Sequence, residues 1–407
     1  MTQSRQITTC RFCTGSLSIP FCDLGATPLA NSYVDPAQAD TPDPVFPLNA
    51  MVCESCHLVQ LDHIVDAHAI FSDYAYFSSF STGWMDHARR FASEATARFG
   101  LGAASFVVEI ASNDGYLLRN FVAAGIPCLG VEPAANVAAA AERAGVPTRV
   151  AFFGAAEARA IVAERGHAGL VIANNVLAHV PDINDFVAGL AILAGPRGRV
   201  SIEAPHLLAL VEQVQFDTIY HEHYAYWSLH AMRQVLEAHG LLLRDVARLP
   251  THGGSLRVLA GAPGSWAHSD LAAVTEAEAE AGVATAAFYA GFAPRVRAVL
   301  DGFLRYINGK RVAAYGAAAK GNTFLNAAGV TQRDILMVAD RNPAKQGRLL
   351  PGSRIPIVSP EALLAARPEE VVILPWNLAT EIASELKPLT DSGSKLLVAV
   401  PRLRRIA

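Results

Sequence analysis

The sequence of 407 residues has little net charge and no long apolar run. No stretch approaches the roughly 18 uninterrupted apolar residues that span a bilayer, although the mean hydropathy is positive. The first residues, MTQSRQITTC, lack the hydrophobic stretch of a signal peptide. With 33 Lys+Arg against 37 Asp+Glu, the net charge of −4 excludes the positive field that binds nucleic acid or an anionic membrane. The 52% hydrophobic content argues against disorder over most of the length. We therefore expect a soluble cytoplasmic protein of about two or three domains.

Cysteine is scarce, but four of the six cysteines form two closely spaced pairs. Cys10 and Cys13 make one C-x-x-C motif, and Cys53 and Cys56 make another. Disulfides are disfavoured in the cytosol, so two such pairs in one N-terminal segment predict a tetrahedral zinc site. Four protein ligands leave no open coordination position, which favours a structural ion. The alternatives are four unrelated buried thiols or a redox pair.

The middle of the chain alternates short apolar runs with helical patterns. The runs are rich in β-branched residues and are typical of buried parallel strands; they cover residues 106–110, 128–131, 169–173 and 199–203. Helical patterns follow the first two runs, at 117–125 and 136–144. This alternation predicts a doubly wound parallel sheet. We place it at residues 86–265, after a zinc-binding module at 1–85.

Polar residues follow the first three predicted strands, where an open parallel sheet binds its ligands. Glu132 lies a little over 20 residues beyond Glu109, the position expected for a carboxylate that binds a ribose diol. The first turn lacks the three glycines of a pyrophosphate cradle, which favours S-adenosylmethionine (SAM) over NAD. Loop residues that merely cap helices are the alternative. The candidate cofactor-binding residues are Glu109, Ala111, Asn113, Gly115, Glu132, Pro133, Asn174 and Asn175.

The last third predicts a helical linker region at 266–305 and a Rossmann-like α/β domain at 306–407. A predicted strand at 311–315 leads into a glycine turn that contains Gly316 and Lys320. Such a turn at a helix N-terminus attracts phosphate through its free N–H groups and the helix dipole. The turn leaves open a second hypothesis, a zinc-containing NAD(P)-dependent oxidoreductase. A third hypothesis is a zinc-stabilised binding scaffold without enzymatic activity.

Long and unusual strings extend through nearly the whole chain. They are CRFC…CESC, YAYFSSFS, EIASNDGYLL, GVEPAANVA, ANNVLAHVPDINDF, QFDTIYHEHYAY, LPTHGGSLRV and YGAAAKGNTFLN. These strings resemble the SAM-dependent sugar C-methyltransferases that act on nucleotide-linked 4-keto deoxysugars. The resemblance implies a zinc module, a central SAM-binding domain and a C-terminal domain that holds the nucleotide. The implied reaction is methylation at C3, beside the C4 ketone, with thymidine diphosphate (TDP) as the commonest carrier and a guanosine carrier (GDP) as the alternative.

A carbon beside a ketone must lose a proton before it attacks a methyl group, which requires a base and donors for the enolate oxygen. The resemblance implies that His223, Tyr220 and Glu222 of the YHEH string belong to the active site. We expect His223 to be the base, because the ordinary pKa of histidine lies nearer neutrality than that of tyrosine. His179 and Tyr76 complete the implied set. An H-x-H metal pair, a packing role for Tyr76 and a capping or core role for His179 are the alternatives.

The resemblance also implies nucleotide contacts from the C-terminal domain, through Tyr315, Lys320, Asn322 and Arg341. Many relatives carry glycine at the position of Ala111, and a methyl group there is tolerable if the backbone has a negative φ. The expected partner is the nucleotide sugar alone, with no nucleic acid and no membrane. We expect a monomer.

Overall fold

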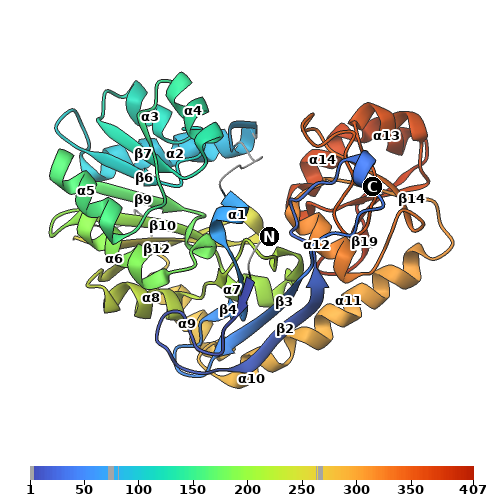
Figure 1. Cartoon of the computed structure of the whole chain (residues 1–407), viewed down its shortest axis with the longest axis horizontal. Coiled ribbons are helices and arrows are strands. Elements are labelled where there is room, and N and C mark those ends of the chain that lie inside the picture. Colours follow the sequence, from blue (N-terminus) through green and yellow to red (C-terminus); the bar gives the residue numbers. More distant parts are fainter. Residues whose placement is uncertain (1–3, 72–77, 81, 263, 265–268) are drawn as a thin grey trace.

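The computed structural model describes residues 4–71, 78–80, 82–262, 264 and 269–407. Two α/β units occupy opposite ends of the molecule, and an antiparallel sheet from the N-terminal region lies between their lower parts (Figure 1). The long helix α11 (Phe292–Ile307) runs from that sheet toward the second unit. In the part of the chain that the structure describes, no helix combines the length and the apolarity needed to cross a membrane.

The N-terminal sheet is an antiparallel meander extended by one short strand from the middle of the chain. Its order is β11-β4-β3-β2, with β2 (Leu17–Thr27), β3 (Phe46–Cys53), β4 (Val59–Leu61) and β11 (Ala225–Tyr226). A second pair joins β1 (Ser4–Gln6) to β5 (His63–Val65), and helix α1 (Ala67–Phe71) follows. Because β11 pairs with β4, the residues just before Ala225 are held against the zinc-binding segment.

The central sheet has seven strands in the order β12-β13-β10-β9-β6-β7-β8. Five are parallel, and β13 runs antiparallel to both of its neighbours. The strands β6, β7 and β9 are buried at every position, which explains their near-continuous apolar sequences. The predicted doubly wound sheet is confirmed. The bounds are β6 (Val107–Ile110), β7 (Cys128–Glu132), β8 (Thr148–Val150), β9 (Leu170–Asn174), β10 (Arg199–Pro205), β12 (Leu243–Leu249) and β13 (Ser255–Gly261).

Helices cover both faces of this sheet. One core contains side chains of α2 (Thr82–Phe99), α3 (Leu118–Ala123) and α4 (Ala135–Arg143). A second core, on the other face, contains side chains of α5 (Ala155–Arg165), α6 (Ile183–Ala194) and α8 (Leu229–Ala238). The short helix α7 (Leu207–Glu212) follows β10 and packs instead toward the N-terminal sheet and the C-terminal unit.

The C-terminal unit contains a six-stranded sheet in the order β16-β15-β14-β17-β18-β19, and all strands but β19 are parallel. The predicted Rossmann-like pattern is therefore present. Its strands are β14 (Val312–Tyr315), β15 (Ile335–Ala339), β16 (Ile357–Val358), β17 (Glu370–Ile373), β18 (Lys395–Val398) and β19 (Arg404–Arg405). Its helices are α12 (Ala319–Ala327), α13 (Pro360–Ala366), α14 (Ala379–Glu385) and α15 (Lys387–Asp391).

Helices α9 (Leu271–Ala281), α10 (Ala286–Ala290) and α11 occupy the segment predicted as a helical linker. They pack against the units that they connect. Phe21 of β2 stacks on Phe292 with ring centroids 4.4 Å apart and meets Tyr289 edge-on at 6.0 Å. These contacts attach the linker to the N-terminal sheet.

Candidate active site and metal centre

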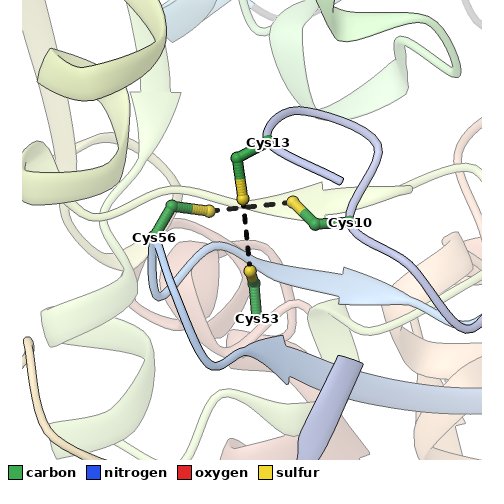
Figure 2. A group of neighbouring side chains, drawn as sticks. All are labelled: Cys10, Cys13, Cys53 and Cys56. Carbon is green, nitrogen blue, oxygen red and sulfur yellow. Dashed lines mark hydrogen bonds between the residues drawn. The ribbon is translucent and has the colours of Figure 1, made fainter. Parts of the chain in front are cut away.

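Four cysteine sulfurs converge on one point in the N-terminal module (Figure 2). All four lie within 4.8 Å of one another. The Sγ atoms of Cys10 and Cys56 are 3.7 Å apart, and those of Cys13 and Cys53 are 3.4 Å apart. A tetrahedral zinc ion with bonds of about 2.3 Å sets its sulfurs about 3.8 Å apart, so the spacing fits zinc.

Hydrogen-bond donors surround these sulfurs, as expected for thiolates. The backbone N–H of Phe12 and the side-chain amide of Gln60 donate to Cys10 Sγ at 3.4 and 3.1 Å. The hydrogen bond between Cys10 and Cys56 is the main cause that lowers the pKa of Cys10 to about 5, and the same bond raises the pKa of Cys56. The thiolate is the metal-binding form, and the donors from Phe12 and Gln60 stabilise that form at Cys10.

The loop after β6 contains three residues with left-handed backbone conformation. Ala111, Asn113 and Gly115 have φ values of 53°, 50° and 75°. A Cβ at Gly115 would lie 2.8 Å from a methyl carbon of Val146, so this position needs glycine. The loop does not adopt the negative φ at which a methyl group at Ala111 would be tolerated without strain. An L-residue in the left-handed conformation costs about 1–2 kcal/mol, and such strain is common in loops that approach a ligand.

Glu132, at the end of β7, holds this loop in place. One carboxylate oxygen accepts the backbone N–H of Asn113 at 3.0 Å, and the other accepts that of Ala134 at 2.9 Å. Pro133 lies between Glu132 and Ala134, in the turn that starts α4. Since each carboxylate oxygen can accept two hydrogen bonds, both retain capacity for a ribose hydroxyl.

Several buried polar atoms in the same loops have no hydrogen-bond partner among the described residues. Burial is the main cause that raises the pKa of Glu109 well above its ordinary value, and nearby Glu132 adds to it. Unpaired buried polar atoms are costly, so the cluster fits a ligand with hydroxyl, amino and carboxylate groups, which SAM carries. The atoms are Glu109 Oε2, Ser112 Oγ, Asp114 Oδ1, Asn174 Oδ1 and both amide atoms of Asn175.

Tyr76 falls outside the described residues, but the residues on either side of that gap contact the site. The backbone N–H of Ser78 donates to Asn113 Oδ1 at 2.8 Å. On the other side of the gap, the Phe71 ring meets His179 edge-on, with centroids 5.6 Å apart. The described flanks therefore reach the cofactor loop and a candidate catalytic histidine.

His223 is held in one tautomer by its neighbours. Its Nδ1 lies 2.8 Å from the Thr218 carbonyl oxygen, which can only accept, so Nδ1 carries the proton. The lone pair of Nε2 therefore accepts the hydroxyl of Tyr220, also at 2.8 Å. The Tyr220 and His223 ring centroids are 4.0 Å apart. The two side chains form a pair through which a proton can move.

Burial keeps both histidines of this site neutral. It lowers the pKa of His223 well below the ordinary value, and His179, with ring centroids 4.8 Å away, lowers it further. Burial also lowers the pKa of His179 to about 4. The Nδ1–H of His179 donates to the Glu222 carbonyl oxygen at 2.8 Å, which leaves its Nε2 as an acceptor. A neutral imidazole is the form that can accept a proton.

The fold brings His179 and His223 to the same sheet edge as the cofactor loops. His179 ends the 3₁₀ turn Leu177–His179, just after β9. His223 lines a small cavity with Ala178 and with Pro205 at the end of β10. The candidate catalytic residues and the candidate cofactor residues therefore share the carboxyl ends of the parallel strands, as expected for this fold.

Glu222 contacts Asn31 of the zinc module, a contact that the sequence did not predict. Its Oε1 accepts the side-chain amide of Asn31 at 2.7 Å. The hydroxyl of Tyr33 donates to the Ala317 carbonyl oxygen at 2.7 Å, and its oxygen lies 3.1 Å from Asn31 Oδ1. This chain of contacts links all three parts of the molecule.

The four residues predicted to contact the nucleotide do not all lie together in the structure. Tyr315 and Arg341 both donate to Glu385, at 3.1 and 2.9 Å. Asn322 is buried and donates to the Ala30 carbonyl oxygen at 3.2 Å. Lys320 donates to Asn377 Oδ1 at 2.9 Å. The structure therefore brings Tyr315 and Arg341 together and sets Lys320 and Asn322 apart from them.

Lys320 lies near the active-site segment, together with residues that the sequence did not single out. Its Nζ is 5.0 Å from the ring centroid of Trp376, whose Nε1–H donates to Asp217 Oδ2 at 2.8 Å. Burial raises the pKa of Asp217 to about 6, although the charge of Lys320 opposes the shift. Burial and then Lys320 lower the pKa of His252 to about 4. Asp217 and His252 belong to two of the strings noted above, QFDTIYHEHYAY and LPTHGGSLRV. Membership of these strings is the sequence signal that could have identified both residues.

The fold and the site define a SAM-dependent methyltransferase with a structural zinc module. Three family models match the chain: a zinc binding domain (residues 10–71), a methyltransferase domain (84–246) and a C-methyltransferase C-terminal domain (250–401). The chain is 37% identical over 411 residues to "C-methyltransferase NovU" of Streptomyces niveus, an alignment that covers 99% of this chain and 98% of that protein. The protein belongs to this C-methyltransferase family, and the oxidoreductase alternative is not favoured.

Solved structures also match the chain, over less than half of its length. Magnesium protoporphyrin IX methyltransferase from Synechocystis PCC 6803, with bound S-adenosylhomocysteine (SAH), is 17% identical with a TM-score of 0.35. That match covers 44% of this chain and 84% of the other. A SAM-dependent methyltransferase from Archaeoglobus fulgidus is 11% identical with a TM-score of 0.35, and the match covers 43% of this chain and 93% of the other.

Proposed function

We propose that this enzyme transfers a methyl group from SAM to C3 of a nucleotide-linked 4-keto deoxysugar, with TDP as the carrier. The observation that carries the proposal is the neutral His223–Tyr220 pair, which lies at the same sheet edge as the cofactor loops. Methylation at carbon requires removal of a C–H proton, and a buried neutral imidazole is suited to that step. The family and the strings shared with sugar C-methyltransferases support the choice of substrate.

SAM, when bound, supplies an electrophilic methyl group. The C3 proton passes to Nε2 of His223, directly or through the Tyr220 hydroxyl that is hydrogen-bonded to it. The electron pair of the broken C3–H bond forms the enolate, which then makes the new carbon–carbon bond as the sulfur–methyl bond breaks and SAH leaves. Thr218 fixes the tautomer of the base.

The other predicted residues take supporting roles. The acceptor Nε2 of His179 suits a sugar hydroxyl, because its Nδ1–H is already bound to the Glu222 carbonyl oxygen. Tyr76 is the proposed donor to the ketone oxygen, and Glu222 orients the substrate through its carboxylate. These assignments rest on the resemblance, and on the described residues that surround them.

The C-terminal unit is the proposed nucleotide site. The candidate contacts remain Tyr315, Lys320, Asn322 and Arg341, supported by the glycine turn at the start of α12. Lys320 is suited to the diphosphate because it belongs to this turn and its charge acts on Asp217, close in sequence to Tyr220 and His223. We also propose that the enzyme works as a monomer in the cytoplasm.

Mass spectrometry of products from a panel of nucleotide-linked sugars tests this function. The panel contains TDP- and GDP-linked 4-keto deoxysugars with either an amino or a hydroxyl group at C3, plus matched sugars without the ketone. We expect a gain of one methyl group on TDP-linked 4-keto sugars only. The proposal would be contradicted if zinc-loaded enzyme binds SAH but methylates none of these sugars. It would also be contradicted if the enzyme methylates the ketone-free sugars equally well.

A further inference from the structure

The side chain of Arg11 leaves the zinc knuckle and reaches the active-site loops. Arg11 lies between the ligands Cys10 and Cys13. Its Nη1 donates to the carbonyl oxygens of Val180 and Pro181 at 2.7 and 3.0 Å. Its Nη2 donates to the carbonyl oxygen of Tyr224 at 2.5 Å. One guanidinium group thus binds three backbone carbonyls on two separate segments.

Both segments carry a candidate catalytic histidine immediately beside the contact. Val180 directly follows His179, and Tyr224 directly follows His223. The backbone N–H of Tyr224 also donates to the Ala178 carbonyl oxygen at 2.7 Å, so the two segments already touch. Arg11 binds across this junction and restricts the relative position of the two imidazoles.

The other end of Arg11 is fixed by the metal centre. Its backbone N–H donates to Gln60 Oε1 at 3.1 Å, and the Gln60 amide donates to Cys10 Sγ at 3.1 Å. Asn184 Nδ2 donates to the Arg11 carbonyl oxygen at 3.2 Å. The backbone from which the guanidinium extends is therefore tied to the ligand Cys10.

We propose that Arg11 is a positioning residue that aligns His179 with His223, so that the zinc centre sets the active-site geometry through it. Only arginine suits this task, because its planar fork presents donors in several directions whereas lysine has one nitrogen. Burial lowers the pKa of Arg11 to about 10, which still leaves it charged at neutral pH. The proposal rests on the catalytic roles proposed above for the two histidines.

The test compares Arg11→Ala and Arg11→Lys with wild-type enzyme, all as full-length, zinc-loaded protein. A displacement of about 1 Å at a reacting group can cost about 100-fold. We therefore expect kcat to fall about 10- to 100-fold in both variants, with little change in KM, in zinc content or in the Kd for SAH. Ethylguanidinium should restore kcat in Arg11→Ala, whereas ethylammonium should not. Arg89→Ala is the control, because Arg89 is exposed on α2.

Histidine side-chain NMR gives a readout that does not depend on turnover. The ¹⁵N and ¹H shifts of His179 and His223 should change in both Arg11 variants, while the exposed His167 stays as in wild type. Unchanged shifts with kcat within about twofold of wild type would overturn the proposal. A loss of zinc or of SAH binding that parallels the fall in kcat would show that Arg11 has only a structural role. That result would also overturn the proposal. If wild-type enzyme methylates no sugar, the proposed function fails, while the NMR comparison still tests Arg11.

Discussion

Replacement of Glu132 tests whether its carboxylate contributes to cofactor binding. Its two carboxylate oxygens accept the backbone N–H groups of Asn113 and Ala134, and each can accept one further hydroxyl. A hydrogen bond to a charged group contributes about 1.5–3 kcal/mol. At about 1.4 kcal/mol per factor of ten, Glu132→Ala should raise the Kd for SAH about 10- to 150-fold.

The same substitution should also lower stability, because two backbone N–H groups lose their acceptor. We expect the free energy of unfolding to fall by about 1–3 kcal/mol. Isothermal titration calorimetry at a temperature where the variant is fully folded separates the two effects. Glu142→Ala is the matched control, since Glu142 is an exposed glutamate on the adjacent helix α4. An unchanged Kd in folded Glu132→Ala protein would refute the role of Glu132.

This carboxylate also predicts a pH dependence of binding. Burial raises the pKa of Glu132 above its ordinary value of 4.5. The ionised form accepts the ribose hydroxyls, so SAH binding should weaken as the pH falls through that raised pKa. The weakening should therefore begin at a higher pH than an exposed glutamate would give.

Three further predictions concern the base, the strained loop and the metal. His223→Asn should lower kcat about 10²- to 10⁴-fold while SAH binding persists, and Tyr220→Phe should match it if the proton passes through the phenol. Because burial lowers the pKa of His223, kcat in wild type should stay level as the pH falls to 6.5 and decline only below it; a decline centred above pH 7 would count against this base. Ala111→Gly should raise the free energy of unfolding by roughly 0.5–1 kcal/mol in urea titrations, since glycine tolerates φ of 53°; lower stability would disprove the strain. Elemental analysis should find one zinc ion per chain, and Cys13→Ser should reduce zinc content and the melting temperature together.

Features that depend on local sequence were predictable. The four cysteine ligands follow from two C-x-x-C motifs, and their sulfurs do converge. The strands β6, β7, β9 and β10 were predicted within about two residues of their ends, because buried parallel strands have short, uniformly apolar sequences. The acid at the end of β7 also lies where the spacing placed it.

Features that depend on distant contacts were not predictable. Asn31 meets Glu222 across 191 residues, and Trp376 meets Asp217 across 159 residues. No periodicity in the chain encodes such pairs, since they arise only when the three units pack. The sign of φ at Ala111 was not predictable for a related reason, because the surrounding loop rather than the residue type determines it.

The fate of a deuterium atom at C3 tests the proposed reaction most directly. A TDP-linked 4-keto deoxysugar labelled with deuterium at C3 is incubated with SAM and enzyme, and the product is analysed by mass spectrometry. A parallel sample without enzyme corrects for spontaneous loss of the label. We expect a product that has gained a methyl group and lost the deuterium, and neither change with His223→Asn. A methylated product that keeps its deuterium would contradict proton removal and methylation at C3.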